Sequence, residues 1–160
     1  MLRRLRDARN AAGCACTVLT ARRDPPHVIG DGVHTVKQLV DKVNADPRRG
    51  DLARHATYFL QFNADTDVAM LNALIHAIID EGLVNDAFVK DRTSGFEALK
   101  ENAKNYSPEK MAPICGIPAR KLREVARLFA TSKGSMILWG MGISQHVHGT
   151  DNARCLIALA

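Results

Sequence analysis

The stretch Ser135–Ala160, SMILWGMGISQHVHGTDNARCLIALA, decides how the chain is organised. Its first part, Met136–Trp139, is an apolar run without polar alternation, which predicts a strand buried on both faces of a parallel sheet. Gly140 and Gly142 then interrupt the run. A new helix is expected to begin near Thr150, and the side chain of Thr150 or Asp151 can cap it. The stretch therefore predicts a strand, a glycine loop and a helix.

The loop between this strand and this helix is the first candidate binding site. Ligands of open α/β sheets bind beyond the carboxyl ends of the strands. A glycine backbone can lie close against a ligand there. The same loop carries hydrogen-bonding side chains at Ser144, Gln145, His146 and His148. By spacing alone, an ordinary strand-to-helix turn explains these residues better than a binding site does.

The composition bounds the class of protein. A chain of 160 residues that is 46% hydrophobic and 24% charged has room for one domain with a core. The formal net charge is +5, but much of the basic excess lies in the first 23 residues, so we expect no nucleic-acid partner. No segment has the roughly 20 apolar residues of a membrane span. The four cysteines form no Cys-x-x-Cys pairs of the kind that hold zinc or an iron–sulfur cluster.

The N-terminal 32 residues differ from the rest of the chain. They are rich in arginine at their start, and Asp24-Pro25-Pro26 and Gly30-Asp31-Gly32 are turn-forming. Asp7 and the lack of a long apolar segment argue against a secretion signal, so we expect a cytoplasmic protein. The predicted organisation is a basic, disordered terminus over residues 1–32, followed by an α/β unit over residues 33–160.

Within the α/β unit, apolar residues recur at helical spacing from Val33 to Val43, which predicts an amphipathic helix. Pro47 ends it, because proline disfavours helix at the residue before it. The β-branched and aromatic residues of Thr57–Phe62 predict a strand. We expect it to lie parallel to Ser135–Trp139 in one sheet, joined by the intervening helices through a right-handed crossover. Those helices are predicted near residues 66–81, 86–90, 95–102, 107–111 and 118–131.

Three stretches resemble the molybdenum-dependent formate dehydrogenases. WGMGISQH at 139–146, followed by HGTDN at 148–152, is similar to the segment of that family that lines a bis-molybdopterin-guanine-dinucleotide cofactor. DPRRGDLARHA at 46–56 and the segment from Phe59 to Ala73 are similar to consecutive segments of the same subunits. The related periplasmic nitrate reductases have a threonine in place of Gly140 and a tryptophan in place of Asp151, so the formate dehydrogenases fit better. The resemblance runs from about residue 46 to residue 160.

The resemblance implies a fold and a set of binding residues. The fold is α/β, a helix-rich portion of a Rossmann-like domain with a parallel sheet. Asp46, Arg48 and Asp67 are expected at a guanosine, since a carboxylate can accept paired hydrogen bonds from guanine N1 and N2 and an arginine can meet a pyrophosphate. The residues expected around the pterin and metal are Gly140, Met141, Gly142 and Gln145.

The sequence departs from the family pattern in two places. The family strand before the Asp-Pro-Arg turn is apolar, whereas Gln38, Lys42 and Asn44 interrupt the corresponding stretch with helical spacing. Asp65 stands where the family has a glycine. Its carboxylate adds negative charge near a diphosphate, and aspartate adopts a positive φ less readily than glycine.

The family's catalytic subunit is several times longer than this chain. Its four-cysteine cluster motif, its molybdenum-ligating cysteine or selenocysteine and the arginine that faces formate have no match here. The resemblance therefore implies an internal, cofactor-binding fragment without catalytic residues or a metal ligand. The implied cofactor contains molybdenum or tungsten, and the iron–sulfur cluster lies outside this segment. The implied partners are the remainder of the catalytic subunit and iron–sulfur or diaphorase subunits.

Three alternatives remain open from the sequence. The chain can be a truncated product with no enzyme activity. It can be a small basic binding protein that acts through its arginine-rich terminus. It can also be a segment of another molybdopterin oxidoreductase, such as a nitrate reductase.

Overall fold

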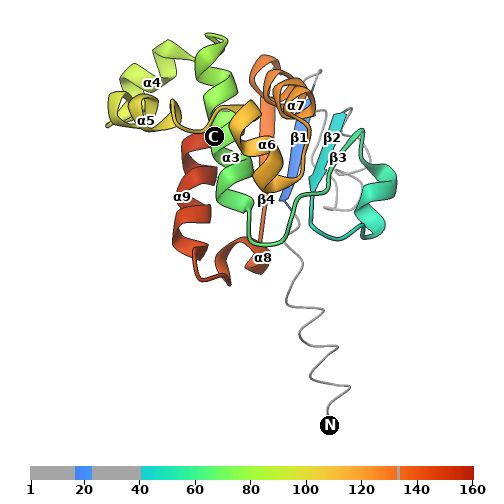
Figure 1. Cartoon of the computed structure of the whole chain (residues 1–160). Helices are drawn as coiled ribbons and strands as arrows, with labels where there is room; N and C mark the ends of the chain where they lie inside the picture. Colours follow the sequence, from blue (N-terminus) through green and yellow to red (C-terminus); the bar gives the residue numbers. More distant parts are fainter. Residues whose placement is uncertain (1–16, 23–40, 133) are drawn as a thin grey trace.

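A computed structural model describes residues 17–22, 41–132 and 134–160. Helices gather on one side of a small sheet, and α4 and α5 are the helices farthest from the strands (Figure 1). The elements, in chain order, are β1 (Thr17–Arg22), β2 (Asp41–Ala45), η1 (Asp51–His55), β3 (Tyr58–Leu60), α3 (Asp67–Asp80), α4 (Asp86–Arg92), α5 (Phe96–Ala103), α6 (Pro108–Cys115), α7 (Ala119–Thr131), β4 (Gly134–Leu138), α8 (Met141–Ser144) and α9 (Gly149–Leu159).

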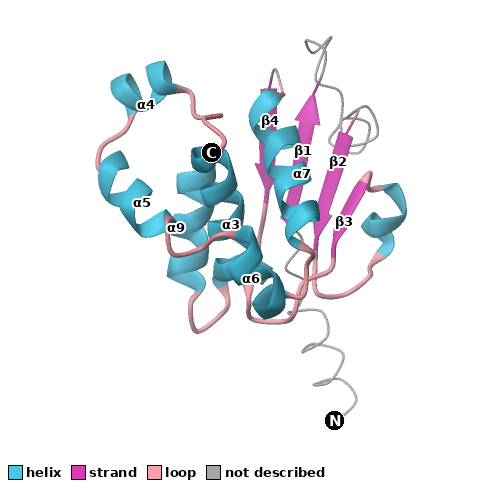
Figure 2. Cartoon of the chain, turned by 45° about the horizontal axis from the view of Figure 1, so that its top comes forward, coloured by secondary structure: helices cyan, strands magenta, loops and turns pink. Residues whose placement is uncertain are grey.

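The four described strands form one sheet in the order β3-β2-β1-β4 (Figure 2). β2 and β3 are parallel, with Val43 opposite Tyr58 and Ala45 opposite Leu60. β1 is antiparallel to both β2 and β4. β2, β3 and β4 therefore run in the same direction, which confirms the predicted common sheet and parallel orientation of β3 and β4. The α/β class is confirmed as well, but the sheet is mixed rather than purely parallel because β1 runs against its neighbours.

β4 corrects the prediction of a strand buried on both faces. It lies at an edge of the sheet, with β1 as its neighbour among the described strands. Met136 is 55% exposed and Leu138 is 40% exposed, while Ile137 packs against the core. The apolar run correctly indicated a strand, but hydrophobicity alone did not reveal which faces have a packing partner.

β2 corrects the predicted helix over Val33–Val43. Residues 33–40 lie outside the described part, and Asp41–Ala45 is a strand. Val43 and Ala45 are buried at 2% and 0% exposure in the core cluster, and β2 lies between β1 and β3. Pairing on both sides satisfies the backbone and overrides a weak helical pattern. β1 lies within residues 1–32, so the prediction of a disordered terminus does not hold for those six residues.

The helices between β3 and β4 begin and end close to where the sequence predicts. Ser107 caps α6, its hydroxyl accepting a hydrogen bond from the Lys110 backbone N–H, and Pro108 occupies the first helical position. Gly82 follows α3 with φ of +65°, a conformation that glycine adopts without strain. These boundaries were predictable because caps and glycine stops act locally.

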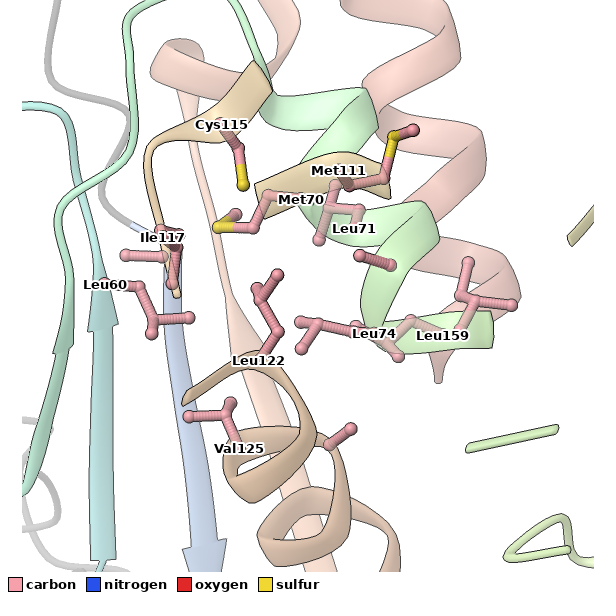
Figure 3. Close-up of a cluster of buried hydrophobic side chains, with 14 of the residues drawn as sticks. Leu60, Met70, Leu71, Leu74, Met111, Cys115, Ile117, Leu122, Val125 and Leu159 are labelled. Carbon is pink, nitrogen blue, oxygen red and sulfur yellow. The ribbon is translucent and has the colours of Figure 1, made fainter. Parts of the chain in front are cut away.

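The core is centred on α3, which packs against α6, α7 and α9. Met70, Leu71 and Leu74 of α3 are fully buried. Figure 3 shows them meeting side chains from β3, α6, α7, α9 and the connection between α6 and α7. The meeting residues labelled there are Leu60, Met111, Cys115, Ile117, Leu122, Val125 and Leu159.

An ion-pair cluster joins the solvent sides of α3, α6 and α7. Arg123 pairs with Glu109 at 2.9 Å and with Glu81 at 3.2 Å, and Arg127 also pairs with Glu81. The hydrogen bond from Arg127 is the main reason that the pKa of Glu81 lies below its usual value, with Arg123 contributing. The charged face of α7 thus fixes three helices together rather than only meeting solvent.

Candidate functional site

Three loops meet at the end of the sheet where β2, β3 and β4 terminate. Asp46 directly follows β2, residues 61–66 connect β3 to α3, and Gly140–His148 follows β4 through α8. Because β2, β3 and β4 run in the same direction, their carboxyl ends lie at this same end of the sheet. Figure 1 shows the connection from β3 to α3 and α8 along the same lower side of the molecule. The topology therefore brings together residues that lie about a hundred positions apart.

Asp67 is the central residue at this end of the sheet. It begins α3, is 1% exposed, and its Oδ1 is the one buried side-chain oxygen or nitrogen of the described residues that has no hydrogen-bond partner. Burial raises its pKa above the usual value, and the nearby carboxylates of Asp65 and Asp46 raise it further. Its own backbone N–H and His146 oppose this rise. A buried carboxylate oxygen without a donor is costly, so a hydrogen-bond donor at this position would stabilise the charged form of Asp67.

The loop before Asp67 is held in place by α6. The Asn63 side chain donates to the Ile114 carbonyl at 2.9 Å, and its backbone N–H donates to the Cys115 carbonyl at 2.8 Å. The Thr66 hydroxyl donates to the Asn63 carbonyl at 2.7 Å. These bonds fix the approach to α3, so the direction of the Asp67 side chain is set by the fold.

Asp46 is the second buried carboxylate, at 5% exposure. Its Oδ1 accepts a hydrogen bond from the Arg48 backbone N–H at 2.7 Å, which shapes the Asp-Pro-Arg turn. Burial raises the pKa of Asp46, while that hydrogen bond and the Arg48 charge lower it. Arg48 itself is exposed, so its guanidinium can reach an anion in solvent.

Asp65 and His146 connect two of the loops. His146 Nδ1 lies 3.4 Å from Asp65 Oδ1, which joins the loop after β3 to the loop after β4. Asp65 has φ of +67° and is the one non-glycine residue with positive φ in the described chain. That conformation costs an aspartate free energy that a glycine does not lose, as the sequence comparison with the family led us to expect.

The glycine loop after β4 is more ordered than predicted. Its middle, Met141–Ser144, forms the short helix α8. Met141 is 62% exposed, Gly140 and Gln145 are exposed, and Gly142 is buried. A Cβ on Gly140 would meet nothing within 4 Å, so the fold of this chain does not require glycine there. The space beside Gly140 is open for a close-lying ligand.

Two residues that were not singled out hold this loop against α9. A Cβ on Gly149 would lie 2.0 Å from the Ser144 carbonyl oxygen, so only glycine fits at the start of α9. Asn152, 2% exposed, donates from Nδ2 to the Ile143 carbonyl at 3.0 Å. His146 is one of the polar loop residues that the sequence singled out. Its position beside Gln145 in the polar loop was visible in the sequence, but its proximity to Asp65 depends on the fold.

The structure thus places the predicted residues in two groups. Asp46 and Asp67 are both buried, and the Asp46 charge contributes to the raised pKa of Asp67, with Arg48 beside Asp46 at the surface. The second group follows β4 at the same end of the sheet and consists of Gly140, Met141, Gly142 and Gln145. No group of three His, Cys, Asp or Glu side chains suited to a metal ion occurs within residues 17–22, 41–132 and 134–160. None of the helices in that part of the chain is long and apolar enough to cross a membrane.

Known proteins share this sequence and this fold. The chain is 38% identical over 134 residues to formate dehydrogenase H of Escherichia coli, covering 84% of this chain and 18% of the relative. It is 40% identical over 115 residues to the alpha subunit of an F420-dependent formate dehydrogenase of Methanocaldococcus jannaschii, covering 72% and 17%. The periplasmic nitrate reductase of Desulfovibrio desulfuricans is 39% identical over 123 residues, covering 71% and 16%.

The solved structure of acetylene hydratase from Pelobacter acetylenicus superposes with a TM-score of 0.71 at 32% identity, over 73% of this chain and 16% of that one. The chain belongs to the molybdopterin oxidoreductases. It is a segment that spans 16 to 18% of the length of these curated relatives. No protein-family model matches the chain. This confirms the family that the sequence motifs indicated, while both formate dehydrogenases and nitrate reductases remain among its relatives.

Proposed function

We propose that this chain is the guanosine-binding segment of a formate dehydrogenase alpha subunit with a bis-molybdopterin-guanine-dinucleotide cofactor. Asp67 and Asp46 accept hydrogen bonds from a guanine or its ribose, and Arg48 meets the pyrophosphate. Gly140, Met141, Gly142 and Gln145 line the pterin. The observation that carries the proposal is the buried Asp67 Oδ1, which has no hydrogen-bond partner and lies at the carboxyl ends of the strands.

The donor and acceptor chemistry of the site fits a guanine. Two neighbouring carboxylates with raised pKa values repel each other and are stabilised by N–H donors. Guanine offers adjacent N–H groups at N1 and N2, and a carboxylate can accept both. The cofactor supplies the redox chemistry at its metal, while these residues only bind and orient its nucleotide end.

Formate is proposed as the substrate of the whole enzyme because two formate dehydrogenases align over 72 to 84% of the chain. Gly140 favours a formate dehydrogenase over a nitrate reductase, since the open space beside it would be partly filled by a larger side chain. A nitrate reductase is the second candidate, favoured by its 39% identity over 123 residues. The partners proposed for the working enzyme are the rest of the catalytic subunit and electron-transfer subunits.

Calorimetric titration of the purified chain with GDP tests the guanosine site. We expect binding by the parent chain and a loss of about tenfold to a hundredfold for Asp67→Ala, because the guanine N–H groups lose their acceptor, at roughly 1 to 3 kcal/mol. Asp65→Gly should bind GDP more tightly, since it removes a negative charge near the diphosphate. All titrations are made at one salt concentration, because screening changes the charge effect.

ADP is the matched control ligand, because it has the same diphosphate but lacks the guanine N1 and N2 donors. Equal affinity for GDP and ADP, or unchanged GDP affinity in Asp67→Ala, would show that Asp67 does not read guanine. Absence of binding by the parent chain would contradict the assembled site.

A further inference from the structure

One pair of side chains joins the loop after β3 to the loop after β4. His146 Nδ1 lies 3.4 Å from Asp65 Oδ1, and the two side chains are 26% and 64% exposed. The His146 imidazole is also close enough to Asp67 to oppose the rise in the pKa of that carboxyl. The imidazole therefore lies near one exposed and one buried carboxylate.

Other hydrogen bonds hold each loop to a helix rather than to the other loop. The Asn63 side chain binds the loop after β3 to α6. The Asn152 side chain donates to the Ile143 carbonyl, which binds the loop after β4 to α9. Among the described residues, the contact between His146 and Asp65 is the polar side-chain contact that joins residues 61–66 to residues 140–148.

The backbone of Asp65 is strained at this contact. Its φ of +67° lies in the left-handed region, which costs an aspartate more free energy than a glycine. Such conformations persist where the surrounding structure holds them, and they gather at functional sites. Asp65 thus keeps a less favourable backbone conformation while its carboxylate contacts His146.

We propose that His146 is a positioning residue that, when protonated, pairs with Asp65 and holds the loop after β4 against the start of α3. Histidine is the side chain that ordinarily changes its charge between pH 5 and 8. A protonated imidazole makes the contact a charge-assisted hydrogen bond, whereas a neutral imidazole leaves a weaker contact. The loop is therefore held more firmly in mildly acidic solution than above neutrality.

The neighbouring elements carry further charged groups. Asp67 begins α3, and Asp46 follows β2 with Arg48 beside it at the surface. On α9, Asp151 and Arg154 pair with each other at 3.3 Å. Burial raises the pKa of Asp67, so this carboxyl can also gain a proton as the solution becomes acidic, and the test must separate the two titrations.

The consequence for binding rests on the proposed function. The loop after β4 carries Met141 and Gln145, which are proposed to line the pterin, and Asp67 is proposed to bind guanine. The pairing of His146 with Asp65 would then make the relative placement of these two parts of the site depend on pH. The pairing itself needs no nucleotide.

Hydrogen exchange of the full chain without nucleotide, followed by NMR at about pH 5.5 and about pH 7.5, tests the pairing. The reporters are the Ile143 N–H, which donates to the Gly140 carbonyl at 3.0 Å, and the Gln145 N–H, which donates to the Met141 carbonyl at 2.8 Å. Each measured rate is compared with the intrinsic rate of an unfolded chain at the same pH. We expect about twofold to fivefold greater protection at the lower pH, a modest gain because Asp65 is 64% exposed.

His146→Gln should remove this difference, because glutamine cannot gain a proton. Asp65→Asn should remove it as well, because asparagine keeps the Cβ but carries no charge. His148→Gln is the matched control, since His148 is an exposed histidine of the same loop, and it should keep the difference seen in the parent. Asp67→Asn should also keep the difference, because Asp65 remains. Circular dichroism checks folding, and variants on both sides of the contact keep the test available if one of them unfolds.

Several results would overturn the proposal. One is equal protection of the parent at both pH values. Another is a difference that persists in both His146→Gln and Asp65→Asn, or one that His148→Gln also removes. A difference lost in Asp67→Asn but kept in His146→Gln would assign the effect to Asp67. Binding of GDP without pH-dependent protection would contradict the pairing alone, whereas pH-dependent protection without GDP binding would contradict the proposed function alone.

Discussion

The two edges of the sheet are protected to very different degrees. β3, at one edge, has only three residues, and Leu60 within it is fully buried. Lys121 donates from Nζ to the Phe59 carbonyl at 2.5 Å, and the Arg49 guanidinium lies 5.8 Å from the centre of the Phe59 ring. β4, at the other edge, has five residues, and its apolar side chains are largely exposed.

This difference concerns how the two edge strands are covered. Proteins usually keep edge strands short or cover them with charged side chains and loops, because an open edge pairs with other chains. β3 follows that rule, whereas β4 is longer and, within residues 17–22, 41–132 and 134–160, keeps Met136 and Leu138 exposed. Among the described residues, the β3 edge is therefore better covered than the β4 edge.

Replacing one leucine at each edge should give the largest contrast. Leu60→Ala removes a fully buried side chain and should lower the free energy of unfolding by about 3 kcal/mol. Leu138→Ala changes the same residue type at 40% exposure and should cost less than about 1 kcal/mol. Urea unfolding followed by circular dichroism measures both. Similar losses for the two variants would mean that β4 is covered in the isolated chain.

Asp67→Asn tests whether the covered side carries a destabilising charge. Burial raises the folded-state pKa of Asp67, so below the unfolded value near 3.8 both states are protonated, and the folded state loses stability as pH rises through the raised value. At pH 7 the variant should be more stable than the parent by roughly 1 kcal/mol. The difference should shrink towards pH 4. A variant less stable than the parent at pH 7 would indicate a partner for the carboxylate.

Lys121→Met tests the protection of β3 directly. The Phe59 carbonyl loses its charged donor, which should cost about 1 kcal/mol of unfolding free energy. Faster hydrogen exchange of the β3 amides should accompany the loss, because the edge opens more easily. Lys90→Met is the control, since Lys90 is an exposed residue of α4 far along the chain from β3. Equal behaviour of the two variants would show that Lys121 does not protect the edge.

Asp65→Gly should have the smallest effect, a gain of about 0.5 kcal/mol. Glycine relieves the positive φ of +67°, and the gain is reduced by the flexibility of glycine in the unfolded chain and by loss of the contact with His146. Asp65→Asn removes the charge but keeps the Cβ, so it separates the two causes. Thermal unfolding of the three chains gives the ranking. A less stable glycine variant would show that the contact with His146 outweighs the backbone strain.

The residues of the candidate site could be proposed from their resemblance to family motifs, but not from hydrophobic periodicity and residue spacing alone. Asp46, Arg48 and Asp67 stand out because their turns match those of a known family. The burial of Asp67 and the missing partner of its Oδ1 could not be read from the sequence, since both depend on α6 holding the preceding loop. The contact of His146 with Asp65 joins residues 81 positions apart and required the parallel arrangement of β3 and β4.

The sequence by itself determined the helices from α3 to α7, because apolar spacing, the cap at Ser107 and the glycine stop at Gly82 act over a few residues. Tertiary structure decided the roles of the strands. The polar stretch Asp41–Ala45 became an inner strand and the apolar stretch Gly134–Leu138 an outer one. A strand is stabilised by the neighbours that pair with its backbone and cover its faces, and those neighbours come from distant parts of the chain.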